Sequence, residues 1–563
     1  MMLSNNSGGT LANYGTLTNI SSGTLANNSD ATLNNNSGGT LTNFGWLNSS
    51  GTLNNNSGGT LDNNSGATLT NNSGGTLTNY GTLTTSGTLN NSGTLNNGAP
   101  DNYMSVMLTN NGRLYNTGTL YNYAAVRGSG TIYNSGTTYN YMDLGGGGSY
   151  VQTAGLTVTT GRMGWYTITI DGAFNLSSTV LGTGRLVAGR QEVIGASGTG
   201  TFNQFGDNSY NSTKDLVLGN NNGSVGTYNL NAGTLYNTNI ELFHSTLNVG
   251  VNGTGNFNQY SGTVLSDTVK IGVGSGGQGT FTQSGGGHTV SLNLYVGYGA
   301  GSVGTYNLNA GTLTNTADNL IGTYFENYPT TVNVGVNGTG YLNQNGGTLS
   351  GNTVNIGTNP AGSGTYTMNQ GSLTTKDLTV GSSGAGAVTG TLAITNAAAQ
   401  VSVGGNLTIN ERGLLNAAPG VTINMTGANF YDYKPNDDLS NLRLFFSNAT
   451  ASDTLGFAGT LRLGTLELTG GTEMEHLTLA LENLLTTPSP MTLYVGNLIL
   501  GDYATLDLNG LNLCFLHETR GTGVSFLDGT PQQVVPLPPS AWLFLSGLVG
   551  LGLLGRRKKG KTS

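Results

Sequence analysis

The sequence contains very few charged residues, which make up 8% of its 563 positions, whereas about a quarter is usual in globular domains. The first hundred residues hold only Asp30 and Asp62, and the first lysine is Lys214. The formal net charge is -8 and the isoelectric point is near 4.9. Nucleic-acid binding requires a basic face, so we expect no nucleic-acid partner. Disordered chains usually carry a high net charge, and the net charge here is low for the length, so the composition does not indicate disorder.

Cysteine is nearly absent as well. Cys514 is the single one, which rules out an internal disulfide framework and leaves an exported chain little to lose by oxidation. We expect Cys514 to be a buried residue of a strand.

Side chains suited to catalysis or metal binding are sparse and scattered. Glycoside hydrolysis needs two carboxylates that face one another across the scissile bond. The densest charged group, Arg185, Arg190 and Glu192, is interpreted as a solvated rim, and Glu241 with His244 is interpreted in the same way. The other candidates lack metal-ligand spacing or the glycine-rich repeats of calcium-binding rolls; they are His288, His476, His517, Asp437 and Asp438. We therefore expect no catalytic residues, no metal and no cofactor.

Glycine fills 94 positions instead, and much of it belongs to a short repeat, Gly-Thr-Leu-x-Asn. Side chains along a strand alternate with a period of two, so even steps keep every leucine on one face. A helix would need steps of three, four or seven and would not tolerate this much glycine. The leucines are spaced by six or eight residues throughout: Leu11, Leu17, Leu25, Leu33, Leu41, Leu47, Leu53, Leu61, Leu69, Leu77, Leu83, Leu89 and Leu95.

An asparagine two places after most of these leucines completes the repeat, as in Asn13, Asn35 and Asn79. Asparagine tolerates left-handed backbone, so we expect it at the corner of a coil. Stacked amides can hydrogen-bond in a ladder, which offsets the cost of desolvating them. These features predict an all-β fold, a parallel β-solenoid (β-helix). We expect three sides and about 18–24 residues per turn, with turns about 4.8 Å apart.

The repeat lengthens after the glycine run at 145–148. Gly-Thr-(Phe/Tyr) now introduces each copy, and each copy leads to an apolar strand closed by glycine, such as Val249-Gly250. A block of thirteen residues occurs verbatim at 223–235 and 301–313. We interpret this offset of 78 residues as three units of about 26, because solenoids grow by duplication of whole repeats.

Five regions follow from these changes. Residues 1–144 form the short-repeat solenoid and residues 150–427 the longer-repeat solenoid. Terminal repeats are atypical because they cap the stack, so residues 428–518, where the composition shifts, are interpreted as a β-rich capping region. A linker at 519–533 then leads to a tail at 534–559.

The tail is an apolar segment that ends in a basic cluster. It is long enough, counted from Val534 to Leu554, to cross about 30 Å of hydrocarbon as one C-terminal helix. Basic residues stay on the cytoplasmic side, which places everything upstream outside the membrane. The expected transmembrane residues are Ala541, Trp542, Leu543, Phe544, Leu545, Leu548, Val549, Leu551, Leu553 and Leu554, and the basic stop is Arg556, Arg557, Lys558 and Lys559.

Directly before this helix stands a proline-containing motif, Val535, Pro536, Leu537 and Pro538. The order of motif, hydrophobic helix and basic end resembles the PEP-CTERM sorting domain of exopolysaccharide-producing Gram-negative bacteria, although the motif lacks the family's central glutamate. The resemblance implies recognition by an exosortase-type sorting enzyme, removal of the helix, and release or attachment at the cell surface. The repetitive body resembles the β-solenoid passengers of autotransporter-like proteins.

An exported protein requires an N-terminal export signal, and Met1–Asn6 has neither a basic nor an apolar region. The repeat is already under way at Gly9. We therefore expect the true start to lie upstream, and we expect the first turn to expose a strand edge that favours association.

Tyrosine occurs 26 times, with a cluster at Tyr115, Tyr121, Tyr123, Tyr133, Tyr139 and Tyr141. Tyr121, Tyr133 and Tyr139 directly follow an inward position, so they should point outward. Rows of exposed aromatic rings stack on sugars, or on one another to stabilise the turns. The sequence leaves both roles open.

These observations favour a non-enzymatic structural or adhesive protein of the extracellular polysaccharide matrix, displayed on or secreted from a Gram-negative cell. Many weak, similar sites along one rod would act multivalently. The expected partners are an exosortase-type enzyme, extracellular polysaccharide, and the membrane through the C-terminal helix. The alternatives are a polysaccharide-active lyase or hydrolase on the same scaffold, and a carbohydrate-binding rod.

Overall fold

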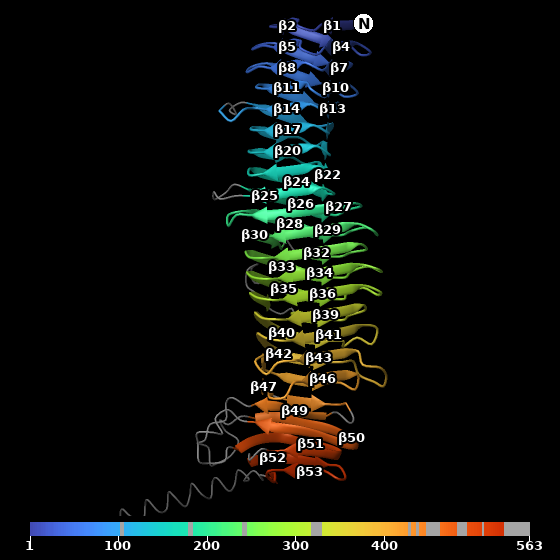
Figure 1. The fold of residues 1–563 in the computed structure, drawn as a ribbon, viewed down its shortest axis with the longest axis vertical. Coiled ribbons are helices and arrows are strands. Elements are labelled where there is room, and N and C mark those ends of the chain that lie inside the picture. Colours follow the sequence, from blue (N-terminus) through green and yellow to red (C-terminus); the bar gives the residue numbers. More distant parts are fainter. Residues whose placement is uncertain are drawn as a thin grey trace, which may run out of the picture. The chain divides into compact units, whose positions relative to one another are not determined.

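The computed structural model describes residues 1–101, 106–177, 184–238, 245–316, 329–425, 429–434, 438–445, 462–480, 492–508 and 512–533. All regular elements in these ranges are β-strands, and they stack in parallel as a solenoid-like repeat (Figure 1). The prediction of an all-β solenoid is confirmed. The predicted C-terminal helix and the rest of the sorting tail lie outside the described residues.

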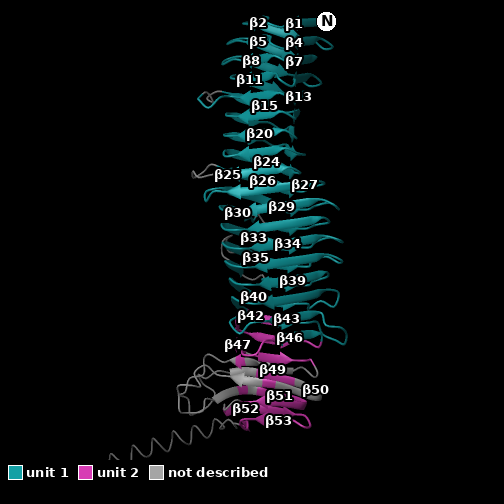
Figure 2. Cartoon of the chain, viewed as in Figure 1, with its two compact units in different colours: residues 1–375, 379–399, 412–416 teal, residues 376–378, 400–411, 417–563 magenta. Residues whose placement is uncertain are grey.

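The chain divides into two compact units (Figure 2). Unit 1 comprises residues 1–375, 379–399 and 412–416, and unit 2 comprises residues 376–378, 400–411 and 417–563. The first part of unit 1 contains β1 (Met2–Asn5), β2 (Thr10–Asn13), β3 (Thr16–Asn19), β4 (Thr24–Asn27), β5 (Thr32–Asn35), β6 (Thr40–Asn43), β7 (Trp46–Ser49), β8 (Thr52–Asn55), β9 (Thr60–Asn63), β10 (Thr68–Asn71), β11 (Thr76–Asn79), β12 (Thr82–Thr85), β13 (Thr88–Asn91), β14 (Thr94–Asn97), β15 (Met107–Asn110), β16 (Arg113–Asn116), β17 (Thr119–Asn122), β18 (Ala125–Arg127), β19 (Thr131–Asn134), β20 (Thr137–Asn140), β21 (Asp143–Gly145), β22 (Ser149–Gln152) and β23 (Leu156–Thr159).

These short strands form turns of three, and each side of the turn is a column of parallel strands, such as β2, β5, β8 and β11. Thr10 pairs with Thr32, Thr76 with Thr94, and Thr82 with Met107. One turn therefore takes 22, 18 or 25 residues at these places, which agrees with the expected three sides and nearly with the expected length. The strands of the first turn pair only with those of the second; whether this edge associates with another chain stays a prediction.

The leucines of the short repeat point inward, as their even spacing predicts. From Leu25 to Leu95 each is at most 2% exposed, and leucines of successive turns are register partners, as Leu69 is with Leu89. Burial of a leucine side chain is worth roughly 1.5–3 kcal/mol. A single column of these side chains therefore supplies much of the cohesion between turns.

The predicted asparagine ladder is also present. Along one side of unit 1, each amide Nδ2 donates to the Oδ1 of the asparagine one turn further on, with N···O distances of 2.7–2.9 Å. Many of these Nδ2 groups also donate to a backbone carbonyl oxygen. Nδ2 of Asn55, for example, donates to the carbonyl oxygen of Thr82 at 2.9 Å. The members of this ladder are Asn13, Asn35, Asn55, Asn79, Asn97, Asn122 and Asn140.

The left-handed backbone expected for these asparagines is not observed. Among the described residues other than glycine, φ is positive at Ser22, Asp30, Tyr503 and Asp528. The ladder asparagines are the last residues of their strands, and glycines such as Gly38, with φ of 75°, make the left-handed step. Asparagine is therefore used here for its amide, while glycine supplies the conformation that a Cβ disfavours.

The three-strand turn ends at β24 (Arg162–Ile170), close to the glycine run at 145–148. The first part of β24 pairs with β21, where Arg162 is the partner of Asp143, and its last part pairs with β22, where Thr167 is the partner of Ser149. Two sides of the solenoid thus merge into one long strand. Subsequent turns combine one long or divided side with one shorter strand: β25 (Ala173–Ser177), β26 (Arg185–Ile194), β27 (Thr199–Phe205), β28 (Tyr210–Leu218), β29 (Val225–Leu230), β30 (Thr234–Asn237), β31 (Thr246–Val249), β32 (Thr254–Gln259), β33 (Thr263–Ile271), β34 (Gln278–Gln283), β35 (Gly287–Val296), β36 (Val303–Leu308), β37 (Thr312–Asn315), β38 (Thr331–Val334), β39 (Thr339–Gln344), β40 (Thr348–Ile356), β41 (Ser363–Met368), β42 (Ser372–Val380) and β43 (Gly390–Ile394).

A column of inward aromatic rings replaces the leucine column here. Successive ring centroids lie 4.5–5.0 Å apart in the order Phe174, Phe202, Tyr228, Phe257, Phe281 and Tyr306. The two verbatim blocks, at 223–235 and 301–313, lie three turns apart. Thr227 pairs with Asn256, Asn256 with Thr280, and Thr280 with Thr305. This confirms the interpretation of the 78-residue offset.

The remaining strands are β44 (Gln400–Val403), β45 (Asn406–Ile409), β46 (Gly413–Ala417), β47 (Val421–Met425), β48 (Asn429–Asp432), β49 (Asp438–Phe445), β50 (Arg462–Ala480), β51 (Thr492–Asp507), β52 (Asn512–Arg520), β53 (Ser525–Leu527) and β54 (Gln532–Gln533). Cys514 is a buried residue of β52, as predicted. Within the described ranges there is no helix of the length and apolarity needed to cross a membrane.

Candidate functional site

Glu192, the acidic residue of the charged group interpreted above as a solvated rim, is buried. Arg185 and Arg190 are exposed, but Glu192 is 0% exposed within unit 1, so the interpretation of all three as a rim is wrong for Glu192. Glu192 shares its parity with Leu186, Ala188 and Ile194, which all face the core, but also with Arg190, which is exposed. A register irregularity between Ala188 and Gln191 turns the intervening residues out.

Glu192 belongs to a buried polar network. Its Oε2 accepts a hydrogen bond of 3.0 Å from Nδ2 of Asn211, which also donates to the Tyr228 hydroxyl at 3.0 Å. Tyr228 in turn donates to Oε1 of Gln204 at 2.5 Å. Burial, partly offset by the Asn211 bond, raises the pKa of Glu192 from 4.5 to about 7. This shift resembles that of some catalytic acids, but a side chain with no exposed surface cannot reach a substrate.

His288 is enclosed in the same way. Its ring stacks on Phe281 with centroids 4.7 Å apart, and its Nδ1 lies 2.9 Å from the Tyr306 hydroxyl. Burial lowers the pKa of His288 from 6.5 to about 3. The ring is therefore neutral and part of the core packing.

The outer tyrosines form columns, and Tyr121, Tyr133 and Tyr139 point outward as predicted. Tyr115 stacks on Tyr133 with centroids 4.8 Å apart, Tyr121 on Tyr139 at 5.1 Å, and Tyr123 on Tyr141 at 4.8 Å. A sugar stacks on the face of a ring, and these faces cover one another. Of the two roles left open by the sequence, the geometry favours stabilisation of the turns.

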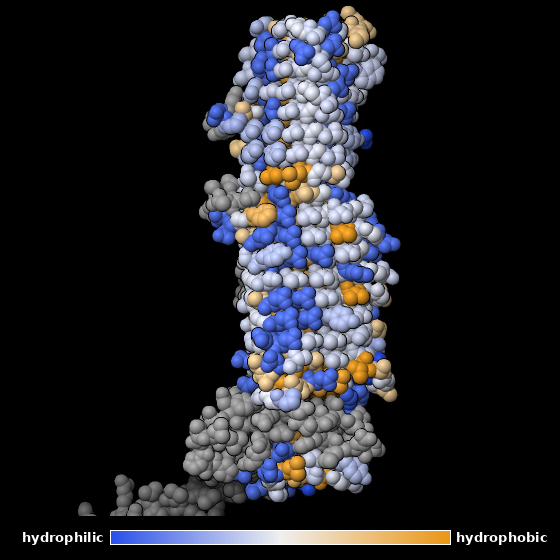
Figure 3. Space-filling model, in the orientation of Figure 1, coloured by the Kyte–Doolittle hydropathy of each residue, from blue (hydrophilic) through white to orange (hydrophobic). Residues whose placement is uncertain are grey.

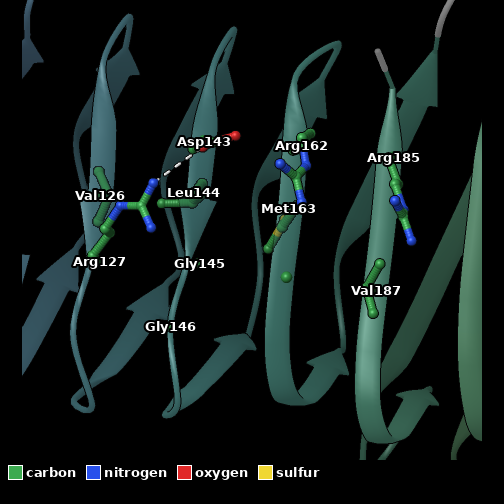
Figure 4. Close-up of a pocket in the computed structure, with 11 residues that line it drawn as sticks. Val126, Arg127, Asp143, Leu144, Gly145, Gly146, Arg162, Met163, Arg185 and Val187 are labelled. Atoms are coloured by element: carbon green, nitrogen blue, oxygen red, sulfur yellow. Dashed lines mark hydrogen bonds and ion pairs between the residues drawn. The ribbon is translucent and has the colours of Figure 1, made fainter. Parts of the chain in front are cut away.

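A groove of about 440 Å³ lies across β18, β21, β24 and β26 of unit 1 (Figure 4). Arginines line it on three of these strands, namely Arg127, Arg162 and Arg185. Its acidic lining residue is Asp143, whose carboxylate lies 3.4 Å from the Arg127 guanidinium. We call this feature the arginine groove.

Two outward rows of side chains build the arginine groove. Asp143, Arg162 and Arg185 are successive register partners and form one row. The second row lies two residues further along the same strands, where Gly145 pairs with Gly164 and Gly164 with Val187. The two glycines leave the floor without side chains. A Cβ added at Gly164 would meet nothing nearer than the Val187 carbonyl oxygen at 3.9 Å, so open space lies before it.

The polarity of the surrounding surface is high. On the face of unit 1 drawn in Figure 3, apolar residues form small, separate patches among polar ones. The exposed large apolar side chains include Trp46, Tyr260 and Tyr341. Scattered apolar residues of this kind are normal on protein surfaces.

Several candidates from the sequence lie outside the described residues: Glu241, His244, Asp437, the motif at 535–538, the transmembrane residues within 541–554 and the basic stop at 556–559. His517 is exposed in unit 2. In the part of the chain that the structure describes, His, Cys, Asp and Glu form no group of three or more that could hold a metal ion.

Sequence reasoning missed Arg127, Asp143 and Arg162 as a group. Asp143 and Arg162 are 19 residues apart and Arg162 and Arg185 are 23 apart. Both separations lie within the range of one turn, which was the only available signal. This signal was weak, because turn length varies along the solenoid. An error of two residues in the assumed turn length moves a side chain into another row.

The described residues define a parallel β-solenoid with a repetitive, charge-poor sequence and an arginine-lined groove on unit 1. Comparison with known proteins adds no family to this description, since no family model, curated protein or solved structure matches the chain.

Proposed function

We propose that the protein is a non-enzymatic structural or adhesive component of the extracellular polysaccharide matrix, displayed on or secreted from a Gram-negative cell. Its tail at 534–559 would act as a PEP-CTERM-like sorting signal, with one transmembrane helix that an exosortase-type enzyme recognises and removes. The body would lie outside the cell membrane.

The stacked repeat is the observation that carries this proposal. Most short turns place an outward threonine and an inward leucine at the same level as the turn before, as in the pairs Thr76 with Thr94 and Leu77 with Leu95. A surface of this kind offers many equivalent weak contacts along one direction. Multivalent binding gains strength from such repetition without any single deep site.

Two alternatives use the same scaffold. A polysaccharide lyase or hydrolase would need exposed acids that converge on a bound sugar, whereas the titratable groups with the largest pKa shifts in unit 1, including Glu192 and His288, are buried. A carbohydrate-binding rod is favoured by a specific observation, the arginine groove, and it is compatible with a structural role.

The location can be tested in the organism that carries the gene. An epitope tag in the exposed turn at 221–223, between β28 and β29, should be detected by antibody on intact cells or in the isolated matrix. Deletion of 534–563 should remove membrane retention. Recovery of the tagged chain only from the cell interior, in cells with an intact envelope, would contradict the proposal.

The absence of catalysis needs a separate measurement. Incubation of the purified full chain with the matrix polysaccharide of its own cells should release no reducing ends above a heat-denatured control. Release that depends on enzyme concentration would instead support the lyase or hydrolase.

A further inference from the structure

We propose that the arginine groove binds an acidic polysaccharide, a carboxylate of which is held by Arg162 and Arg185 on neighbouring turns of the solenoid. This inference rests on the proposed function and names a ligand class and a site for it.

The charges of the groove are the first argument. Arginine and lysine occur five times in the first 200 residues, at Arg113, Arg127, Arg162, Arg185 and Arg190, and three of these five line one groove. Such concentration is unexpected in a chain that otherwise avoids charge.

The arrangement of these charges is unfavourable without a ligand. Arg162 and Arg185 are direct register partners, and like charges at such positions destabilise a sheet. Asp143 is the other neighbour of Arg162, but its carboxylate lies against Arg127. Among the described residues, Arg162 has no ion-pair partner, and the Arg185 guanidinium lies 5.1 Å from the ring centroid of Tyr210. An anion between Arg162 and Arg185 would relieve their repulsion.

The shape of the groove favours a chain over a small anion. The groove crosses four successive turns, which corresponds to about 14 Å at the usual spacing of parallel strands. At Gly164 its floor is backbone alone, with open space before it, which leaves room for the body of a sugar. Figure 4 shows Arg162 and Arg185 on neighbouring strands, with Asp143 on the strand between them and Arg127.

The spacing of the arginines fits the ligand chemistry. Arg162 and Arg185 lie on neighbouring strands, which are about 4.8 Å apart, whereas Arg127 lies two strands from Arg162 with Asp143 on the strand between them. The planar guanidinium group forms paired hydrogen bonds with a carboxylate. A chain of uronic acids that runs across the strands can therefore place a carboxylate between Arg162 and Arg185.

The test measures binding of an oligosaccharide to the purified full chain in mild detergent, by calorimetry at low salt. The probe is a tetramer of galacturonic acid, and its control is the same tetramer with methyl-esterified carboxylates, which has the same backbone without charge. We expect the acid to bind and the ester to bind at least tenfold more weakly. Equal binding of the two would overturn the proposal, as would binding of galacturonate monomer as tight as that of the tetramer.

Substitutions locate the site. The double change Arg162→Gln and Arg185→Gln should weaken binding of the acid tetramer at least tenfold. Gly164→Gln, which fills the floor without changing the charge, should weaken it at least threefold. The control is Arg113→Gln, an equally exposed arginine on β16 away from the groove, which should alter binding less than twofold.

Two results would overturn the assignment of the site: wild-type affinity in the double variant, or an equal loss in the Arg113 variant. Thermal unfolding of each variant checks that the fold is kept, and removal of two repelling exposed charges should not lower the unfolding temperature. These outcomes are independent of the proposed function. An intracellular location of the tagged chain would contradict that function while leaving the binding result intact.

Discussion

The buried carboxyl of Glu192 should make the stability of unit 1 decrease as the pH rises. In the folded chain the pKa of Glu192 is about 7, against 4.5 for an unperturbed glutamate. Below pH 4.5 the carboxyl is protonated in both states and contributes no pH dependence. Between pH 4.5 and 7 the unfolded chain releases the proton while the folded chain keeps it, so unfolding becomes easier as the pH rises. Above pH 7 both states are ionised and the loss is complete.

The size of this loss follows from the shift. One pKa unit corresponds to about 1.4 kcal/mol, so raising the pKa from 4.5 to about 7 costs about 3 kcal/mol at alkaline pH. Glu192→Gln keeps the size of the side chain and an oxygen that can accept the bond from Asn211, yet it cannot ionise. We expect the variant to match the wild type near pH 4.5 and to be more stable by about 3 kcal/mol at pH 8.

Long repeat arrays do not always unfold in one step, so a local measurement is preferable. Hydrogen exchange of the amides in β26 and β28, corrected for the pH dependence of intrinsic exchange, reports opening around Glu192. At pH 8 these amides should exchange roughly a hundredfold more slowly in the variant than in the wild type. Asp207→Asn is the matched control, because Asp207 is exposed in the turn between β27 and β28 and its removal should leave exchange in both strands unchanged.

The reasoning would be refuted if wild type and Glu192→Gln kept the same difference in protection at pH 4.5 and pH 8. A more stable wild type at pH 8 would refute it equally. The comparison of the two proteins removes the contributions of all other titrating groups, including His288, whose effect has the opposite sign.

Three further predictions concern the same unit. The pKa of His288 is lowered to about 3, so the unfolded chain gains a proton below pH 6.5 that the folded chain does not, and stability should fall as the pH drops from 6.5 toward 3. His288→Phe should remove this dependence, and an equal drop in unfolding temperature between pH 7 and pH 4 for both proteins would contradict it. Asn79→Ala removes the partner of Asn55 and Asn97 and leaves the Met107 carbonyl without its donor, which should cost about 2–3 kcal/mol in urea unfolding. The half-buried Asn96→Ala should cost less than about 1 kcal/mol, and similar losses in the two variants would disprove the importance of the ladder. Gly250→Ala should be severely destabilising, by more than about 3 kcal/mol, because φ is 72° and the new Cβ would lie 2.1 Å from the Gln278 carbonyl oxygen. At Gly223 φ is 78° but a new Cβ would meet open space, so Gly223→Ala should lower the free energy of unfolding by only about 1–2 kcal/mol. Equal losses for Gly250→Ala and Gly223→Ala would show that the close approach of turns does not matter.

The positions of single residues show how far sequence reasoning reaches. Leu33 and Leu53 are buried because the repeat keeps their parity, and the amides of Asn35 and Asn55 meet for the same reason. Cys514 and the outward Tyr139 are also where the local pattern places them. In each case the alternation of side chains along a strand, a local property, decides the face.

Glu192 shows where that reasoning stops. Its parity matches that of the buried Leu186 and Ile194 but also that of the exposed Arg190, so parity alone does not decide which of the two charged residues is buried. Only the structure shows Asn211 and Tyr228 arranged to accommodate a buried carboxyl. The cost of burying a charge depends on such partners, and they come from two other strands, β28 and β29.

The sequence by itself determined the class of fold, since even spacing with glycine turns allows inward leucines and stacked asparagines only in a solenoid of short strands. Tertiary structure decided which distant residues meet. Turns of 18, 22 and 25 residues occur in one unit, and their lengths determine whether Arg162 lies beside Arg185 and whether Gly145 lies beside Gly164. No local pattern carries that information, because the position of a side chain along the stack depends on the lengths of all the turns between it and its neighbour.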